Sequence, residues 1–278
     1  EQLRKDPGPW GLVRLAERTH NDGRVDEARA MFRAAAVLFA SRGLLAHALC
    51  AYDGARAPLS ADDIAHDLRK LSELGAGDMA LRQQELRRIG GLPYLEALRA
   101  QTAGVDRGAT VATPFLSALP PDAFARLGAL SRVRRVPAGA HVLREGEPGD
   151  SLFAIGEGRL VVTCTPSGID PTDGAVAIDD EPDEFDERTD PGIGVKRVSG
   201  VVVAPGLESE LGRQLGDGDE ETQAFAHAVD ASRVFLSALT AGDLFGEFSF
   251  LTGRPRSASV EAVTSCRIVE ITKRAVGP

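Results

Sequence analysis

The chain has 278 residues, a formal net charge of −9 and 43% hydrophobic residues, which allows two domains with sizeable cores. It contains no apolar run of about 18 residues, and the apolar stretch from Ala34 to Ala40 is short and flanked by Arg33 and Arg42, so we expect no membrane partner. The acidic balance also argues against nucleic acid as the main partner.

Residues 9 to 74 are rich in Ala and Leu, with Gly at turns, and this composition predicts helices. A pattern of small and aromatic residues recurs at an offset of 20. Its members are Gly23, Ala28, Phe32 and Ala35, then Gly43, Ala48, Tyr52 and Ala55. The first set, with Leu12, Leu15 and Ala16, resembles the packing positions of a tetratricopeptide repeat, although that family has a period of about 34 residues. We therefore expect a tetratricopeptide-like helical domain over 9–102.

Two further helices are expected within this domain, at 78–90 and 92–102, after a helix that Ser60-Ala-Asp-Asp63 would cap and that would run to Leu74. Stacked helix pairs present grooves to peptides, so a protein partner is one reading of this region. The other reading is a helical extension that only packs on the next domain or forms a homodimer. Residues 103–113 lack helical periodicity and are rich in small residues, so we place a linker there.

The second domain is expected over 114–273 and begins with a helix that reaches Leu130 and that Asp122 would cap. Short strand runs follow between 134 and 162. Turn signals separate them at 137–139, 147–150 and 156–158. Short strands at such intervals are typical of a sandwich or a barrel.

An acidic segment interrupts this domain at residues 166–230. It carries 17 acidic against 4 basic residues, a net charge of −13, which leaves +4 for the rest of the chain. High charge with little hydrophobic content predicts a disordered insert. Calcium binding is the weaker alternative, because the carboxylates lack the spacing and the central Gly of an EF-hand loop.

The most informative motif is Leu244-Phe-Gly-Glu-Phe-Ser-Phe-Leu-Thr-Gly-Arg-Pro-Arg-Ser-Ala-Ser-Val260. A turn at Gly246 and a short helix starting at Glu247 should lie between two strands. The backbone N–H groups at the N-terminus of a helix have no partner inside the helix, and they attract anions. The guanidinium of Arg256 adds a positive charge with paired N–H donors, which suits phosphate. Glu247 is unsuited to phosphate, but it can accept a hydrogen bond from a sugar hydroxyl.

This motif closely resembles the phosphate-binding cassette of the cyclic-nucleotide-binding domain. That domain is a jelly-roll (double-stranded β-helix) module, found in the catabolite activator protein and in the regulatory subunits of cyclic-AMP-dependent kinase. The matching residues are Phe245, Gly246, Glu247, Ser249, Leu251, Pro255, Arg256, Ser257, Ala258, Ser259 and Val260. The turns at Glu145-Gly146 and Gly149-Asp150-Ser151 resemble the first half of the same family. In all, the resemblance covers about 114–164 and 232–273, and it implies a mainly-β jelly roll there. With the helices expected from the composition of the N-terminal part, we expect a multidomain chain in which a helical repeat-like array precedes the jelly roll.

The resemblance implies specific roles for the site residues. Glu247 would accept the ribose 2′-hydroxyl and Arg256 would hold the cyclic phosphate. Backbone N–H groups near Gly246, Glu247 and Ala258, with the Ser257 hydroxyl, would complete the cradle. We also expect Phe248, which follows Glu247 in the chain, to be one of the ligand-binding residues.

We therefore expect a non-catalytic cytoplasmic sensor of a cyclic purine mononucleotide, cyclic AMP favoured over cyclic GMP, that relays occupancy to a partner. One alternative is a Glu247–Arg256 ion pair in a site that has lost its ligand. Another is an interaction scaffold that works through the helical repeats. Catalysis is not expected, because the common nucleotide, hydrolase and metalloprotease motifs are missing and no general base or metal site accompanies Glu247 and Arg256.

Family members normally continue into helices after the last strand, here expected at 265–271, and those helices are missing. Since the chain also starts at Glu1, we expect it to be part of a longer protein. Cys50, Cys164 and Cys266 lie in apolar surroundings and are expected to be buried thiols rather than disulfides or metal ligands, which suits a reducing cytoplasm. No other cofactor or metal is expected, and His47 is expected to be structural.

Overall fold

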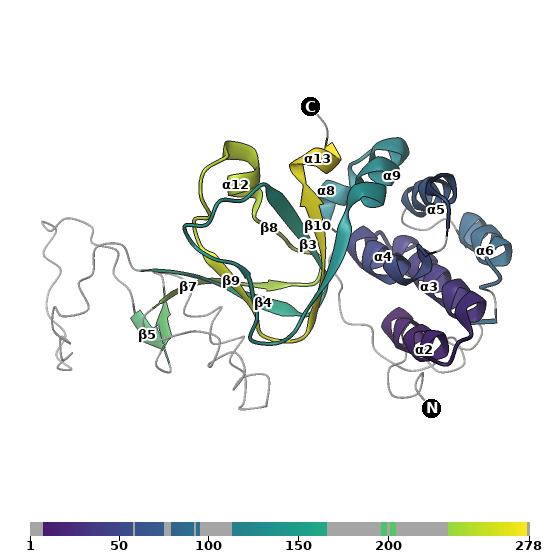
Figure 1. Cartoon of the computed structure of the whole chain (residues 1–278), viewed down its shortest axis with the longest axis horizontal. Coiled ribbons are helices and arrows are strands. Elements are labelled where there is room, and N and C mark those ends of the chain that lie inside the picture. The colour runs from purple at the N-terminus through teal and green to yellow at the C-terminus, as the bar shows by residue number, and fades with distance from the viewer. Residues whose placement is uncertain are drawn as a thin grey trace, which may run out of the picture.

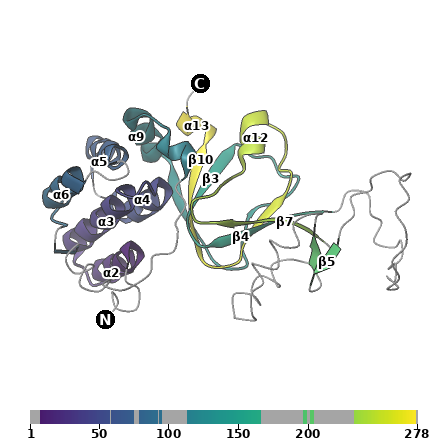
Figure 2. The ribbon, with the colours of Figure 1, turned by 180° about the vertical axis from the view of Figure 1, so that it is seen from behind.

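The computed structural model describes residues 8–57, 59–74, 79–91, 93–94, 113–165, 196–198, 201–203 and 233–276. They form three layers, visible in Figure 1: a layer of helices, a first sheet against it, and a second sheet on the far side of the first. Figure 2 shows the same order from behind.

The helical layer contains the N-terminal helices of the described chain. These are α2 (Pro9–Asn21), α3 (Val25–Ala40), α4 (Leu45–Tyr52), the 3₁₀ turn η1 (Asp53–Ala55), α5 (Ala61–Glu73) and α6 (Met79–Arg88). The short α8 (Pro114–Ser117) and α9 (Pro121–Leu130) follow, and α9 packs along α5. The expected helices near 60–74 and 78–90 are confirmed, whereas most of 92–102 lies outside the described residues.

The offset of 20 has a structural basis. Gly23 and Gly43 both have positive φ, 82° and 76°, in the turns that follow α2 and α3. An L side chain is strained there, so glycine makes each turn. The other repeated positions are all buried: Ala28, Phe32, Ala35, Ala48, Tyr52 and Ala55. The tetratricopeptide likeness itself stays a prediction.

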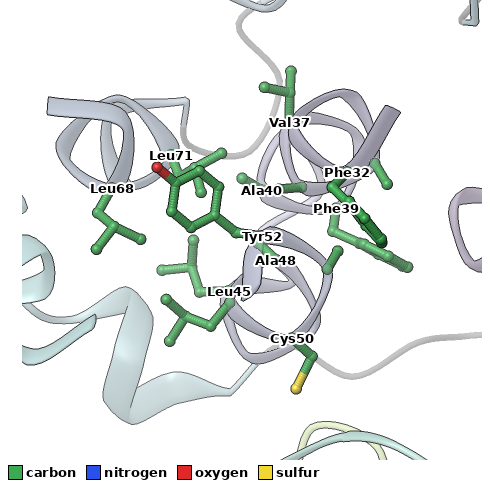
Figure 3. Packing of buried hydrophobic residues seen from close by; sticks show 14 of the residues in the cluster. Phe32, Val37, Phe39, Ala40, Leu45, Ala48, Cys50, Tyr52, Leu68 and Leu71 are labelled. Atoms are coloured by element: carbon green, nitrogen blue, oxygen red, sulfur yellow. The ribbon is translucent and has the colours of Figure 1, made fainter. Parts of the chain in front are cut away.

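A single core holds the helical layer together and continues into the first sheet. Figure 3 shows Tyr52 reaching from α4 toward Leu68 and Leu71 of α5, with Cys50 on another side of α4. The Cys50 thiol is buried and lies against Gly156, where an added Cβ would sit 2.4 Å from its Sγ. Glycine at 156 therefore lets α4 approach the sheet closely.

The two helix caps expected from sequence had different outcomes. Ser60 caps α5, because its hydroxyl accepts a hydrogen bond from the Asp63 N–H at 3.1 Å. The cap expected at Asp122 is wrong. Pro120 is the cap of α9, and Asp122 lies in the first turn, where it pairs with Arg69 of α5 at 2.6 Å. Pro121, at the first helical position, has its φ fixed near the helical value and lacks an N–H that would need a cap, so the helix starts without a side-chain cap.

Two sheets make up the rest of the described fold. The first has the order β1 (Arg132–Val136), β10 (Cys266–Thr272), β3 (Ser151–Glu157), β8 (Leu244–Phe245). The second has the order β2 (His141–Leu143), β9 (Ser259–Ala262), β4 (Arg159–Cys164), β7 (Val234–Thr240), β6 (Val201–Val203), β5 (Lys196–Val198). All described pairs are antiparallel except β6 with β7. The sheets fit the expected mainly-β half, while its jelly-roll order stays a prediction.

Strand β3 explains why the first sheet lies in the middle. Successive side chains of a strand point to opposite faces. Leu152 and Ala154 belong to the core shared with the helices, while Phe153 and Ile155 belong to the core between the sheets. Both faces are therefore covered, and residues 151–156 are all buried.

The ends of the inserted segment meet at one carboxylate. Glu145 accepts hydrogen bonds from the Thr165 N–H at 2.7 Å and from Arg233 at 3.1 Å. Arg233 also donates to the hydroxyl of Ser259 at 2.8 Å. The expectation of an insert without regular structure is wrong for β5 and β6, which extend the second sheet. The remaining residues of 166–230 lie outside the described part of the chain.

The three cysteines are free, with Cys50 and Cys266 buried and Cys164 half-buried. In the described ranges, no group of His, Cys, Asp and Glu side chains is arranged to hold a metal ion. Nor is any helix there both long and apolar enough to span a membrane. The structure agrees with the structural role expected for His47, since its side chain is buried and packs against the rings of Trp10 and Phe39.

Candidate functional site

The site begins where β8 ends and the chain turns at Gly246. This glycine has a φ of 82°, and the six-residue helix α12 (Glu247–Thr252) starts directly after it. A Cβ at this position would lie 2.9 Å from Nη1 of Arg256 and 3.1 Å from the carbonyl oxygen of Ser151. The turn therefore needs glycine both for its backbone conformation and for its room.

Arg256 is the buried cation of the site, with only 6% of its surface exposed. Its Nη1 donates to the Gly246 carbonyl at 2.9 Å, and its Nη2 donates to the Ser151 carbonyl at 2.8 Å. The two bonds tie the loop after α12 to the turn before it and to the start of β3. They use only part of the donor capacity of a guanidinium.

Gly149 shapes the channel that holds this guanidinium. A Cβ at 149 would sit 2.0 Å from Nε of Arg256, a distance that no side chain can occupy. Two backbone hydrogen bonds bring the segments together, from the Gly146 N–H to the Arg256 carbonyl and from the Arg256 N–H to the Glu147 carbonyl, both at 2.8 Å. The loop before β3 thus encloses Arg256.

Two stacked aromatic rings lie beneath the site. Phe153 of β3 and Phe245 of β8 have ring centroids 5.0 Å apart and nearly parallel planes. The guanidinium carbon of Arg256 lies 5.9 Å from the centroid of the Phe153 ring, within the range of a cation–π contact.

A cavity of about 180 Å³ opens between α12, the loop after it and the second sheet. The six residues that sequence singled out all line it: Gly246, Glu247, Phe248, Arg256, Ser257 and Ala258. Its apolar wall comes from the sheets, from Leu143, Val162, Leu239, Leu244, Phe245 and Val260. Residues from distant parts of the chain therefore surround one hollow.

Arg256 is buried and has three carboxylates in its surroundings. Burial lowers the pKa of Arg256, and the carboxylates of Asp150, Glu247 and Glu270 offset part of that effect. Among the described residues, the guanidinium bonds to carbonyls rather than forming an ion pair with Glu247. The arrangement expected for a closed Glu247–Arg256 pair is therefore not the one that the structure has.

Sequence reasoning missed the residues that position Arg256. Ser151 contributes a carbonyl, Gly149 contributes space and Phe153 contributes a ring. Gly149 and Ser151 stand in one of the turns that carry the resemblance, but nothing in the sequence says that this turn meets residue 256. The apolar wall from β2, β4 and β7 had no local signal either.

Two comparisons with known proteins bear on this site. Residues 221–277 match the family model of the cyclic nucleotide-binding domain. A search of curated proteins found no match.

Solved structures give weaker likenesses. The regulatory domain of Toxoplasma gondii PKA, crystallised with cAMP, has 18% identity and a TM-score of 0.34, over 59% of this chain and 41% of that one. The catabolite activator protein of Thermus thermophilus has 17% identity and a TM-score of 0.33, over 58% and 47%. The N-terminal domain of a Streptomyces coelicolor transcriptional regulator has 18% identity and a TM-score of 0.34, over 59% and 72%.

This chain spans less than half the length of the first two of these structures. The segment that carries Gly246, Glu247 and Arg256 matches the cyclic nucleotide-binding domain.

Proposed function

We propose that this chain is a non-catalytic sensor that binds a cyclic purine mononucleotide in the cavity beside Arg256 and relays its occupancy to a partner. The observation that carries the proposal is the position of Arg256. This arginine is almost fully buried, is fixed by two carbonyls, and lines a cavity together with a carboxylate and a hydroxyl. A buried cation with donor capacity left is suited to the exocyclic oxygens of a cyclic phosphate.

The other lining groups fit the parts of such a ligand. Glu247 would accept the ribose 2′-hydroxyl, and the Ser257 hydroxyl with backbone N–H groups near Gly246, Glu247 and Ala258 would complete the phosphate cradle. The cavity of about 180 Å³ is smaller than the roughly 300 Å³ at which ligand pockets usually begin. The sugar phosphate would therefore lie inside, with the base against Phe248, whose side chain is 43% exposed.

Replacing Arg256 with alanine is expected to weaken cyclic AMP binding roughly 10- to 150-fold, because one charge-assisted phosphate contact contributes about 1.5–3 kcal/mol. The measurement is a calorimetric titration of the full chain with cyclic AMP and, in parallel, cyclic GMP. We expect cyclic AMP to bind more tightly than cyclic GMP, and the ratio of the two measured affinities tests this.

Arg254→Ala is the matched control, because Arg254 is an exposed arginine in the same loop, and its affinity should stay within about twofold of wild type. Gly149→Ala is the second variant. It keeps the guanidinium but displaces it, so it should also lose affinity while Arg256 is still present. Saturable binding in wild type that neither Arg256→Ala nor Gly149→Ala reduces would refute the proposed site.

Glu247→Ala is expected to reduce the affinity for cyclic AMP about tenfold but to change the affinity for 2′-deoxy cyclic AMP little. The difference arises because the deoxy ligand has no 2′-hydroxyl that could donate a hydrogen bond to the carboxylate. Titrating both ligands into both proteins gives a double cycle that isolates this contact. Equal losses for the two ligands would remove Glu247 from its proposed role.

A further inference from the structure

The chain at 257–258 lines the cavity beside Arg256, and both of its neighbours are bonded to the loop between β2 and β3. Arg256 is bonded to residues 146–147 of that loop through two backbone hydrogen bonds, both at 2.8 Å. Ser259 is bonded to it through its hydroxyl, which accepts a hydrogen bond from the Glu145 N–H at 3.0 Å. One loop therefore holds this part of the cavity wall on both sides.

Arg233 completes the contact at Ser259. Its Nη2 donates to the Ser259 hydroxyl at 2.8 Å and to Oε2 of Glu145 at 3.1 Å. Ser259 is only 2% exposed, and two N–H donors use both acceptor sites of its hydroxyl oxygen. The same Oε2 of Glu145 also accepts from the N–H and the hydroxyl of Thr165, at 2.7 and 3.0 Å. Glu145, Arg233 and Ser259 thus join the end of β4, the start of β7 and the start of β9.

The two charged members of this group lie outside the cavity. Neither Glu145 nor Arg233 lines it, and their side chains are 27% and 25% exposed. Glu261, two positions after Ser259 on β9, is a second carboxylate within electrostatic range of Arg233, and it pairs with His141 at 3.6 Å. Arg233 can therefore influence the contacts of a ligand only through the chain that it holds.

We infer that Glu145 and Arg233 are positioning residues of the nucleotide site, an inference that rests on the function proposed above. Through Ser259 they fix the chain at 257–258, which would supply a hydroxyl and a backbone N–H to the phosphate. Such groups bind an anion well only when neighbouring contacts already hold them in place. Without Arg233, the buried hydroxyl of Ser259 loses one of its two donors and Glu145 loses the cation beside it, so the chain is held less firmly.

The test compares Arg233→Met with Arg233→Lys in the full chain. Both hydrogen bonds of Arg233 come from one nitrogen, so a lysine ammonium can make them, whereas methionine keeps only the apolar stem. In a calorimetric titration, Arg233→Met should weaken cyclic AMP binding roughly tenfold, and Arg233→Lys should stay within about threefold of wild type. Arg144→Met is the matched control, because Arg144 is an exposed arginine beside Glu145 and its loss changes the net charge equally.

Hydrogen exchange of the unliganded protein gives a second measurement that needs no nucleotide. The amides of Gly146 and Arg256 donate the two backbone bonds between the loop and the chain at 256. Arg233→Met should speed their exchange roughly tenfold, and Arg233→Lys should not. The amide of Ile155, which donates to the Asp243 carbonyl at 3.0 Å in the first sheet, should keep its wild-type rate, because the change is local rather than global.

A double variant tests whether Arg233 acts through Ser259. Arg233→Met and Ser259→Ala break the same contact, so together they should weaken cyclic AMP binding little more than the stronger single change does. The positioning role is ruled out if the two losses add, if Arg144→Met or Arg233→Lys costs as much affinity as Arg233→Met, or if Arg233→Met leaves the exchange of Gly146 and Arg256 unchanged. Absence of cyclic AMP binding to wild type would instead remove the proposed function, and the exchange rates would still decide whether Arg233 holds this chain.

Discussion

Replacing Asp67 with alanine is expected to lower the free energy of unfolding by about 3–5 kcal/mol, the usual effect of removing one partner from a buried ion pair. Asp67 is 5% exposed and joins four helices. Its Oδ1 accepts from Arg33 of α3 and Arg88 of α6, both at 2.6 Å. Its Oδ2 accepts from the hydroxyl of Tyr52, at the end of α4, at 2.9 Å.

The cost is large because three donors lose a buried acceptor, and of the three Arg88 keeps a second carboxylate partner in Glu85. Burial and the adjacent Asp67 raise the pKa of Tyr52, so its hydroxyl stays neutral at pH 7 and donates a hydrogen bond. Chemical denaturation followed by circular dichroism gives the measurement. Asp62→Ala, at an exposed aspartate in the first turn of the same helix, should cost no more than about 1 kcal/mol. Similar losses in the two variants would contradict a structural role for the buried network.

Acidification from pH 7 to pH 5 is expected to remove about 2 kcal/mol of stability through His47 alone, and about 3 kcal/mol by pH 4. Burial lowers the pKa of His47 from 6.5 to about 4. Between these values the unfolded chain binds a proton that the folded chain does not. The stability is therefore fully present above pH 6.5 and is lost as the pH falls toward 4.

Buried carboxylates also contribute to acid unfolding, so the effect is measured as a difference between proteins. His47→Leu removes the titrating group from its apolar site, and its unfolding free energy should fall less steeply between pH 7 and pH 5 than that of wild type. His20→Gln removes an exposed histidine instead and serves as the matched control. Parallel pH profiles for wild type and His47→Leu would rule out this contribution.

The parts of the fold that sequence predicted well depend on local patterns. The turn at Gly246, the helix after it and the strand beyond it are encoded within a few residues, so their order was predictable. Because Gly246, Glu247, Ser257 and Ala258 all belong to this short segment, it was also predictable that they line one cavity. Helix α5 was equally predictable because Ser60 caps it locally.

The parts that sequence did not predict depend on contacts between distant residues. Gly149 and Arg256 lie more than a hundred positions apart, and only the fold brings them together. The Asp67 network joins side chains from four helices, and the hydrophobic periodicity of each helix does not determine the angles at which the helices pack against one another. Strand β3 was expected, but the burial of both its faces depends on the helical layer that packs against the first sheet.

That double burial has a mechanical consequence. The Ser151 end of β3 is held by Arg256, and the next residues project alternately into the two cores. Close-packed interiors deform little. We therefore expect that a ligand that displaces the Arg256 guanidinium would shift β3 and the helices packed on it together, rather than β3 alone.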